Sequence, residues 1–124
     1  MAAEISPLTV ALTFTKASAG VSSAIVWSES NLNRDVAGGK VIQNIQIVGL
    51  AAEQILIGDI GTLGYVMLKN VDPTNFITLR NGSGGADVIK MIPGDIAVFR
   101  AAASTIFALA DTAPALLRVL AIEL

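Results

Sequence analysis

Four polar side chains crowd around one proline in the stretch LKNVDPTNFITLR, which runs from Leu68 to Arg80. They are Asn70, Asp72, Thr74 and Asn75. Such a cluster could be a functional site or only a turn. Pro73 presets φ near the value that a turn needs, and Asp72 can accept hydrogen bonds from the backbone just beyond it. Because Asn75 also tolerates left-handed geometry, every polar residue has a structural role, and the sequence favours a turn.

Five aspartates at expected strand ends are the next candidates for chemistry, because loops at one end of a β-sandwich could bring two or three of them together. They are Asp59, Asp72, Asp87, Asp95 and Asp111. Oxygen clusters of this kind bind calcium. No Asp-x-Asp spacing supports such a site, so we expect no metal there. A calcium ion between strand-end loops stays open as an alternative.

The composition offers little to enzymatic chemistry. The chain contains no cysteine and no histidine, so a thiolate nucleophile, a thiolate metal site and a histidine base are all excluded. Its serines would need a lysine base, and no spacing marks one. The eight Lys and Arg residues are scattered singly, so there is no basic stripe for nucleic acid. We therefore expect no catalytic residue, no cofactor and no small-molecule substrate.

Sugar binding and phosphate binding are the remaining small-ligand alternatives. A sugar site or a glycosidase cleft needs exposed aromatic rings, and the chain has one Trp, one Tyr and four Phe. Trp27 could be a stacking platform, but a position in the core or at an interface is favoured. The glycine-rich segment Asn81–Gly85 could cradle phosphate only ahead of a helix. The residues from Asp87 onward have the pattern of a strand, which predicts a flexible hairpin loop.

The composition also shows an excess of apolar residues. Hydrophobic residues make up 53% and charged residues 15% of the chain, against roughly 25% charged in an average soluble domain. Charges recur too often for the roughly 20 consecutive apolar residues of a membrane-spanning helix. The start MAAEISPL carries Glu4 where a signal peptide needs positive charge. We expect neither segment, and we expect the apolar excess to be buried against other subunits.

Short runs of β-branched and aromatic residues, separated by turn signals, are typical of an all-β sandwich or barrel. Leu8–Thr15 alternates most clearly, with Val10, Leu12 and Phe14 on one side. The expected strands are Leu8–Thr15, Val21–Trp27, Val41–Val48, Gln54–Ile57, Gly64–Val71, Asn75–Leu79, Val88–Met91, Ile96–Arg100, Thr105–Leu109 and Leu116–Leu124. Their number predicts an all-β, antiparallel, jelly-roll-like β-sandwich, a single domain over residues 1–124 with little or no helix.

Three connecting or ambiguous segments complete this prediction. Residues Val41–Ala52 also place apolar side chains at helical spacing, but the density of β-branched residues favours a strand over Val41–Val48. Ser30–Gly39 is polar and glycine-ended, so we expect it to form the longest exposed, irregular loop. Ile92–Asp95 has Pro and Gly at the central positions of a type II turn.

The last feature of the sequence is the polarity of the strand sides that should point away from the core. Gly64–Asn81 is expected to form one antiparallel hairpin, with the turn at Pro73, and both of its faces are largely apolar. Leu116–Leu124 is likewise apolar on both sides. A strand of a simple sandwich has one polar side, so we expect a subunit interface on at least one of these segments. Its candidate residues are Tyr65, Met67, Phe76, Leu117, Val119, Leu120 and Ile122.

The stretch GYVMLKNVDPTNFITLR (Gly64–Arg80), followed by a glycine loop and IPGDIAVFR (Ile92–Arg100), resembles small all-β structural proteins encoded beside the capsid genes of tailed bacteriophages. Their pattern is a Gly-Tyr strand start, a Lys/Arg-Asn-x-Asp-x-Thr-Asn-Tyr/Phe hairpin, and a Pro-Gly-Glu/Asp turn that leads into an Ala-x-Phe/Leu-Arg strand. The closing strand LLRVLAIEL (Leu116–Leu124) is similar to their final strand. The resemblance covers roughly Gln54–Leu124, and it departs at Pro73, where a small residue such as Ala is expected.

The resemblance implies a non-enzymatic virion component: a capsid decoration (cement) protein that binds the outer surface of a phage head, or a tail or head–tail accessory protein. A small sugar- or calcium-binding sandwich module is the alternative from another class. The implied partners are the phage major capsid protein and further copies of the chain, in a homotrimer, with no nucleic acid and no membrane. The implied location is the capsid surface, after synthesis in the cytoplasm of the bacterial host.

Overall fold

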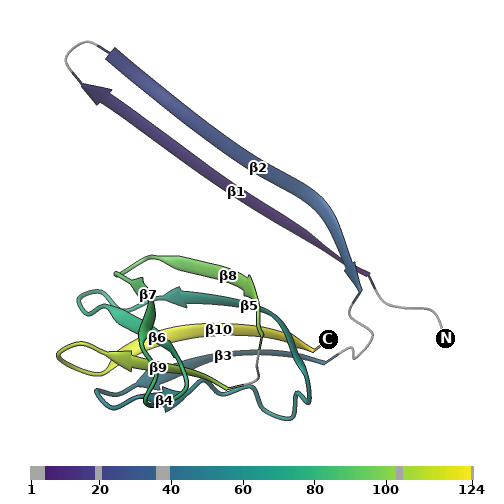
Figure 1. Cartoon of the computed structure of the whole chain (residues 1–124), viewed down its shortest axis with the longest axis vertical. Coiled ribbons are helices and arrows are strands. Elements are labelled where there is room, and N and C mark those ends of the chain that lie inside the picture. The colour runs from purple at the N-terminus through teal and green to yellow at the C-terminus, as the bar shows by residue number, and fades with distance from the viewer. Residues whose placement is uncertain (1–4, 19–20, 36–39, 103–104, 124) are drawn as a thin grey trace. The chain divides into compact units, whose positions relative to one another are not determined.

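The structure, a computed structural model, describes residues 5–18, 21–35, 40–102 and 105–123, and in these residues it has ten strands and no helix (Figure 1). All strand pairings are antiparallel, so the predicted all-β, antiparallel architecture is confirmed. Among the described residues no helix has the length and apolar character needed to cross a membrane. The chain divides into two compact units, Met1–Ala37 and Gly38–Leu124.

The first unit consists of one antiparallel β-hairpin. Its strands are β1 (Ile5–Ser18) and β2 (Val21–Asp35), of 14 and 15 residues. They pair along their described length, with one register shift between Leu8 and Val10. The alternation of threonine and apolar residues in β1 suits an extended conformation, because β-branched residues favour strands. The two strands form a sheet of their own and do not join either sheet of the sandwich.

The prediction of an irregular loop at Ser30–Gly39 is wrong for the first part of this segment. Residues Ser30–Asp35 continue β2 and pair with the beginning of β1, while residues 36–39 lie outside the described residues. A polar segment forms a strand when a partner strand satisfies its backbone hydrogen bonds, and Ser30 is exposed, as the polarity predicted. Polarity therefore indicated exposure here, and it did not indicate irregular structure.

The second unit is an eight-stranded β-sandwich in its described residues. One sheet has the order β3-β10-β5-β8 and the other the order β4-β9-β6-β7 (Figure 1). The strands are β3 (Val41–Val48), β4 (Glu53–Gln54), β5 (Leu63–Asn70), β6 (Ile77–Asn81), β7 (Asp87–Met91), β8 (Ile96–Arg100), β9 (Ile106–Ala110) and β10 (Ala115–Glu123). This strand order is that of a jelly roll, as predicted. The strand interpretation of Val41–Val48 is confirmed as well.

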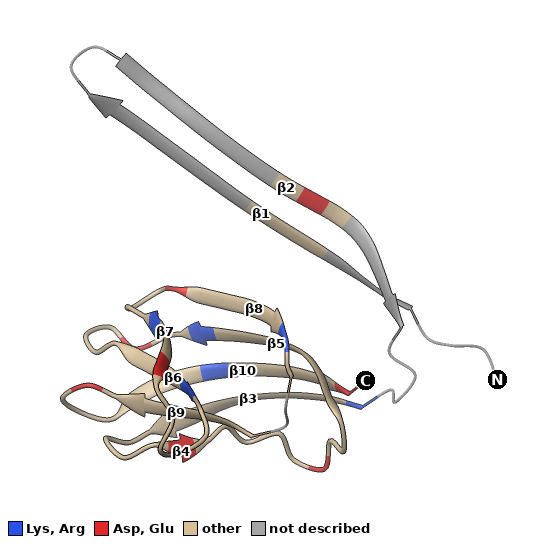
Figure 2. Ribbon diagram, in the orientation of Figure 1, with Lys and Arg blue, Asp and Glu red and all other residues tan. Residues whose placement is uncertain are grey.

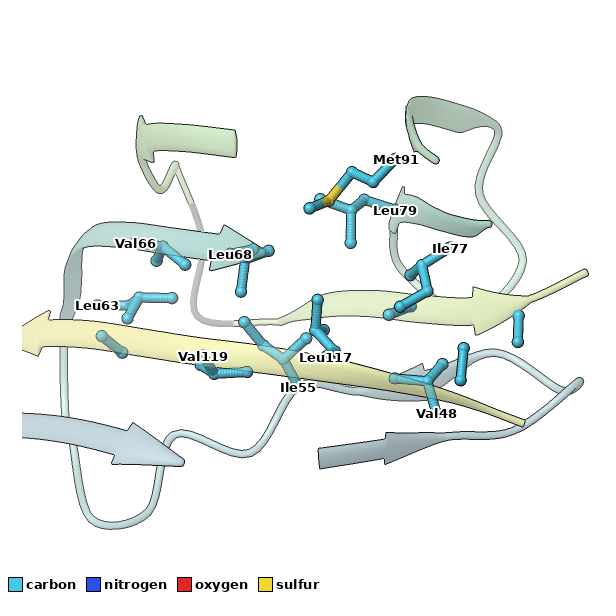
Figure 3. Close-up of a cluster of buried hydrophobic side chains, with 14 of the residues drawn as sticks. Val48, Ile55, Leu63, Val66, Leu68, Ile77, Leu79, Met91, Leu117 and Val119 are labelled. Carbon is cyan, nitrogen blue, oxygen red and sulfur yellow. The ribbon is translucent and has the colours of Figure 1, made fainter. Parts of the chain in front are cut away.

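The core lies between the two sheets, where alternate residues of each strand point inward (Figure 3). Its fully buried large side chains include Val48, Ile55, Val66, Leu68, Ile77, Met91, Leu117 and Val119. Both sheets contribute to it: β3, β5 and β10 from one side, and β6 and β7 from the other. Hydrophobic alternation with period two explains most of this burial, because it gives strands such as β10 an apolar side to place against the facing sheet.

The prediction of a hairpin over Gly64–Asn81 is wrong. β5 pairs with β10 and β8, whereas β6 pairs with β7 and β9, so the connection at Pro73 crosses from one sheet to the other. The local sequence specifies a turn, but it does not specify which sheet the next strand joins, because that depends on strands far away in the sequence. β5 and β6 still bury one apolar side each, since they face each other across the core.

Candidate interaction surface

The polar cluster around Pro73 forms the turn between the two sheets. The Asp72 Oδ2 atom accepts hydrogen bonds from the backbone N of Asn75 at 2.8 Å and of Thr74 at 3.0 Å. These two hydrogen bonds, with that of Asn75 the larger contribution, hold the pKa of Asp72 below its usual value because they stabilise the charged carboxylate. The carboxylate is therefore used within the turn, and the predicted turn is confirmed.

The buried side chain of Asn70 holds this turn through hydrogen bonds. Its side chain is fully buried, and its Nδ2 atom donates to the carbonyl oxygens of Asn75 at 2.9 Å and Met91 at 2.8 Å. Its Oδ1 atom accepts a hydrogen bond from the backbone N of Asp72 at 2.9 Å. Buried polar groups need such partners. Because the amide is occupied inside the fold, Asn70 has a structural role in this corner.

The predicted turn at Ile92–Asp95 lies in the same corner as the turn at Pro73. The backbone N of Asp95 donates to the Ile92 carbonyl at 2.9 Å, and Gly94 has φ of 91°. This geometry confirms the predicted type II turn, which requires a positive φ at its third residue. The backbone N of Gly94 also donates to the Asn70 carbonyl at 2.8 Å. The two segments that carry the phage resemblance are thus joined by hydrogen bonds.

Two further aspartates and the glycine loop have local roles. Asp87 Oδ1 lies 2.6 Å from Arg80 Nε, and Asp59 Oδ2 lies 3.4 Å from Lys40 Nζ. In the described ranges, no three acidic side chains form a group that could hold a metal ion. The glycine-rich segment after Asn81 connects β6 to β7 as a hairpin loop, which confirms the sequence interpretation.

The outward side of the β3-β10-β5-β8 sheet carries most of the exposed large apolar side chains found in the described residues. Strand alternation directs one side of each of its strands away from the core. The exposed members are Val41, Ile45, Ile47, Met67, Ile96, Val98 and Leu116. The half-buried members are Tyr65, Leu120 and Ile122. These ten residues are called the apolar face below.

The apolar face is large for a surface of an isolated subunit. Its seven exposed members leave roughly 600–700 Å² of their surface accessible, at or above the upper end of the roughly 300–600 Å² of the largest apolar patch on a typical monomer. It approaches the roughly 800 Å² that each partner contributes to a stable protein interface. The size alone therefore favours an interaction surface.

β3 shows that this surface is not a by-product of core packing. Its outward residues Ile45 and Ile47 are 63% and 67% exposed, whereas its inward residue Gln46 is buried. The Gln46 side chain accepts a hydrogen bond from the backbone N of Leu56 at 2.9 Å and donates to the carbonyl of Gln54 at 3.1 Å. A polar residue inside and isoleucines outside invert the usual pattern of a sandwich strand. The isoleucines contribute nothing to the sandwich core.

The charges on the outward side of this sheet are all positive. Lys69 of β5 lies directly opposite Arg118 of β10, and Arg100 ends β8 (Figure 2). Within the described part of the chain, neither Lys69 nor Arg118 has an ion-pair partner. Like charges directly opposite each other destabilise a sheet. An acidic group from a partner would relieve this repulsion.

Four of the seven predicted interface residues lie on the apolar face: Tyr65, Met67, Leu120 and Ile122. Leu117 and Val119 are a correction, because both are 0% exposed in the core and neither can contact another subunit (Figure 3). Both sides of β10 are apolar, so the alternation alone does not say which side faces inward. Leu124, which the sequence pattern groups with Leu120 and Ile122, lies outside the described residues.

The interface prediction for Phe76 stays a prediction, but Phe76 does not share a face with Tyr65 and Met67, because it lies immediately before β6 of the other sheet. It precedes β6, and Lys90 Nζ lies 4.1 Å from the centroid of its ring. A cation over an aromatic ring is an attractive pair, so Phe76 has a local partner. It is not part of the apolar face because the connection after β5 crosses between the sheets.

The sequence analysis missed the contributions of β3 and β8 to the apolar face. The segment Ile96–Phe99 is apolar at every position, which is the same two-sided pattern that marked β10. β3 gave a weaker signal because polar residues interrupt both of its sides, Gln43 on one and Asn44 and Gln46 on the other. In both strands the register, and not the composition, decides which residues point outward.

The hairpin unit carries an exposed surface as well. Its side chains are described at residues 9–11 and 28–30, and all six are exposed. Val10 lies directly opposite Glu29 in the β1–β2 register. The predicted core or interface role of Trp27 stays a prediction, because its side chain lies outside the described residues.

Comparisons with protein-family models, with curated proteins and with solved structures find no match to this chain. A function therefore has to be argued from its surfaces and from the phage resemblance of its sequence. The apolar face with its central Lys69–Arg118 pair is the feature of the described residues that most needs a functional explanation.

Proposed function

We propose that this chain is a non-enzymatic structural protein of a bacteriophage virion, a decoration protein that binds the outer surface of the head and stabilises it. The observation that carries the proposal is the apolar face, with roughly 600–700 Å² of accessible apolar residues. An isolated monomer with such a surface tends to aggregate, and assembly removes the surface from water. A protein built for assembly explains why this face is apolar although the core does not need it.

The phage assignment is supported by the two sequence segments that resemble virion proteins. In the fold these segments form the corner around Asn70, to which the turns at Pro73 and Gly94 are both hydrogen-bonded. Their polar residues are occupied by the fold itself. The resemblance is therefore one of architecture, which suits a structural family better than a family defined by a ligand site.

The proposed partners are further copies of this chain and the phage major capsid protein. A homotrimer matches the three-fold and quasi-three-fold positions of a capsid lattice, because a closed oligomer binds most favourably where the lattice has the same symmetry. The proposed location is the capsid surface, and assembly would follow synthesis in the host cytoplasm.

Quantitative mass spectrometry of purified particles tests the proposal. We expect the chain in many copies per particle, in a fixed ratio to the major capsid protein. A copy number that fits one ring of subunits would instead assign it to the tail or the head–tail connection. Recombinant protein added to heads that lack it should bind and raise their resistance to heat. Absence of the chain from the particles, together with no binding to heads, would overturn the proposal.

A further inference from the structure

Lys69 and Arg118 lie side by side in the middle of the apolar face. The strand register arranges the outward residues of this sheet in rows that cross its strands. The row with the two cations consists of Ile45, Arg118, Lys69 and Ile96. The row on one side consists of Gln43, Leu120, Met67 and Val98, and the row on the other side includes Ile47 and Leu116. Uncharged and mostly apolar side chains therefore enclose the cation pair.

A small hollow opens beside this pair. Its volume is about 80 Å³, and its lining consists of Gln43, Met67, Lys69, Arg118 and Leu120. A site for one water molecule needs about 10–15 Å³, so the hollow has room for a carboxylate group. The lining offers two cations and a side-chain amide, all of which are hydrogen-bond donors. The hollow thus has the size and the chemistry to receive an anionic side chain.

The cation pair decides what kind of layer can cover the face. A purely apolar layer would take two like charges out of water without a partner, which is costly. The same face of a second copy fits no better, because the outward positions of its four strands include Lys69, Arg100 and Arg118 and no acidic residue. Like charges across an interface repel. The layer that fits is apolar and carries a carboxylate near its centre.

The carboxylates of the sandwich itself are nearly all in use. Those that pair or accept a hydrogen bond within their own subunit are Glu53, Asp59, Asp72, Asp87, Asp95 and Glu123. Asp111 is the exception among the acidic side chains that the structure describes in this unit. A carboxylate from a different protein is therefore favoured, and Asp111 is the position at which the sandwich of a second copy could supply one.

Two other anionic partners fit this face less well. A nucleic acid presents rows of phosphates, and proteins bind them with many cations, whereas apolar residues surround the two cations here. On a surface that binds a membrane, Lys and Arg reach the headgroups while their neighbours enter the apolar layer. Such cations belong at the rim, but Lys69 and Arg118 lie in the centre. The arrangement therefore favours a protein surface.

We propose that an Asp or Glu side chain of the phage major capsid protein inserts into the hollow beside Lys69 and Arg118, and that apolar residues around it cover the apolar face. The inference rests on the proposed function and adds to it the surface of contact and the chemistry of the partner. The contact neutralises the two like charges and removes the apolar face from water at the same time.

Carbodiimide cross-linking of the wild-type chain on phage heads tests this contact. The reagent activates a carboxylate, a neighbouring lysine amine attacks the activated carbon, an amide bond forms, and the reagent leaves as its urea. We expect an amide between Lys69 and an Asp or Glu of the major capsid protein, identified by mass spectrometry after digestion. Lys40 and Asp59 are the internal positive control, because their Nζ and Oδ2 atoms lie 3.4 Å apart. Lys90, on the other sheet, should form no cross-link to the capsid protein.

The carboxylate that is cross-linked to Lys69 identifies the partner. A cross-link to Asp111 of a second copy, and none to the capsid protein, would overturn the inference in favour of contact between copies. Absence of any cross-link from Lys69, with the Lys40–Asp59 amide formed, would overturn it as well. Wild-type chain that binds vesicles of phosphatidylcholine and phosphatidylserine, while Lys69→Glu does not, would assign the face to a membrane instead.

The variant Lys69→Glu separates binding from folding. It places a carboxylate opposite Arg118, so the subunit should be at least as stable as the wild type, because opposite charges replace like charges. Its affinity for heads should fall at least about tenfold, since the inserted carboxylate then meets a charge of its own sign. Lys90→Glu makes the same charge change on β7 and should bind like the wild type. Urea denaturation measures stability, and co-sedimentation with heads measures affinity.

The outcomes also distinguish this inference from the proposed function. A folded Lys69→Glu variant that binds heads as tightly as the wild type would overturn the inference and leave the virion proposal intact. A wild-type chain that is absent from particles and does not bind heads would overturn both.

Discussion

The two outer faces of the sandwich belong to sheets with the same number of strands, but they differ in whether their charged side chains have partners. On the β4-β9-β6-β7 sheet, Arg80 Nε pairs with Asp87 Oδ1 at 2.6 Å. On the β3-β10-β5-β8 sheet, Lys69 lies opposite Arg118, without an acidic partner in the described ranges, among exposed apolar side chains.

This difference indicates which surface is complete in the single subunit. A face whose charges are paired locally gains little from a partner. A face with unpaired like charges and a large exposed apolar area is stabilised when another layer covers it. The two faces thus separate what holds the subunit together from what the subunit offers to a partner, and substitutions on one strand can distinguish the two roles.

The largest expected effect separates the two sides of β10. Leu117→Ala should lower the free energy of unfolding by about 2–5 kcal/mol, because truncation of a fully buried leucine leaves a cavity. Leu116→Ala, the outward neighbour, is the matched control and should cost less than about 1 kcal/mol in dilute protein. Urea denaturation measures both. Equal losses would contradict the assignment of the inward and outward sides.

A smaller effect is expected where the two sheets are joined. Asn70→Ala should cost about 1–3 kcal/mol, because the Met91 carbonyl and the backbone N of Asp72 lose a buried partner. Asn81→Ala removes an exposed amide and should be close to neutral. Urea denaturation followed by circular dichroism gives both values. A neutral Asn70→Ala variant would show that the corner does not hold the sheets together.

The charged residues test the comparison of the faces directly. Arg80→Ala should lower the free energy of unfolding by up to about 1 kcal/mol, since it removes a partly exposed ion pair. Arg118→Ala should be neutral or slightly stabilising in dilute, monomeric protein, because it removes the repulsion with Lys69. Thermal unfolding of both variants, with salt added in parallel, measures the difference. A larger loss for Arg118→Ala would mean that this cation has a stabilising partner within the subunit.

The smallest expected effect depends on pH. The folded-state pKa of Asp72 is lowered, so its contribution to stability is present above the ordinary carboxylate pKa and is lost as the pH falls through the lowered value. Asp72→Ala should therefore be less stable than the wild type at neutral pH, and the difference should shrink in acid. Denaturant unfolding over a descending pH series, with Asp111→Ala as the control for general acid effects, measures it. A difference that does not change with pH would contradict the role of the carboxylate.

Much of the architecture could be predicted from the sequence, because strands and turns depend on local chemistry. The alternation in Leu8–Thr15, the Pro-Gly turn at Ile92–Asp95 and the turn at Asp72 were predicted where the structure has them. The strands that pair with β5 were not predicted, because a turn of the same sequence can lead to a neighbouring strand or to the facing sheet. The apolar excess predicted a subunit interface, which stays a prediction, and the structure places four of its seven candidate residues on the apolar face.

The sequence by itself determined where most strands of the sandwich lie and that the composition is unusually apolar. The expected strand Gln54–Ile57 is wrong beyond Gln54, because β4 is only Glu53–Gln54 and Ile55 enters the core from outside a strand. Only the tertiary structure decided which side of β10 is covered, so that Leu117 is buried and Leu116 is exposed. It also decided that Gln46 points inward, where its side-chain oxygen accepts a hydrogen bond from the backbone N of Leu56. The physical reason is the same in both cases: side-chain alternation defines two sides of a strand, and contacts with distant strands decide which of the two faces the core.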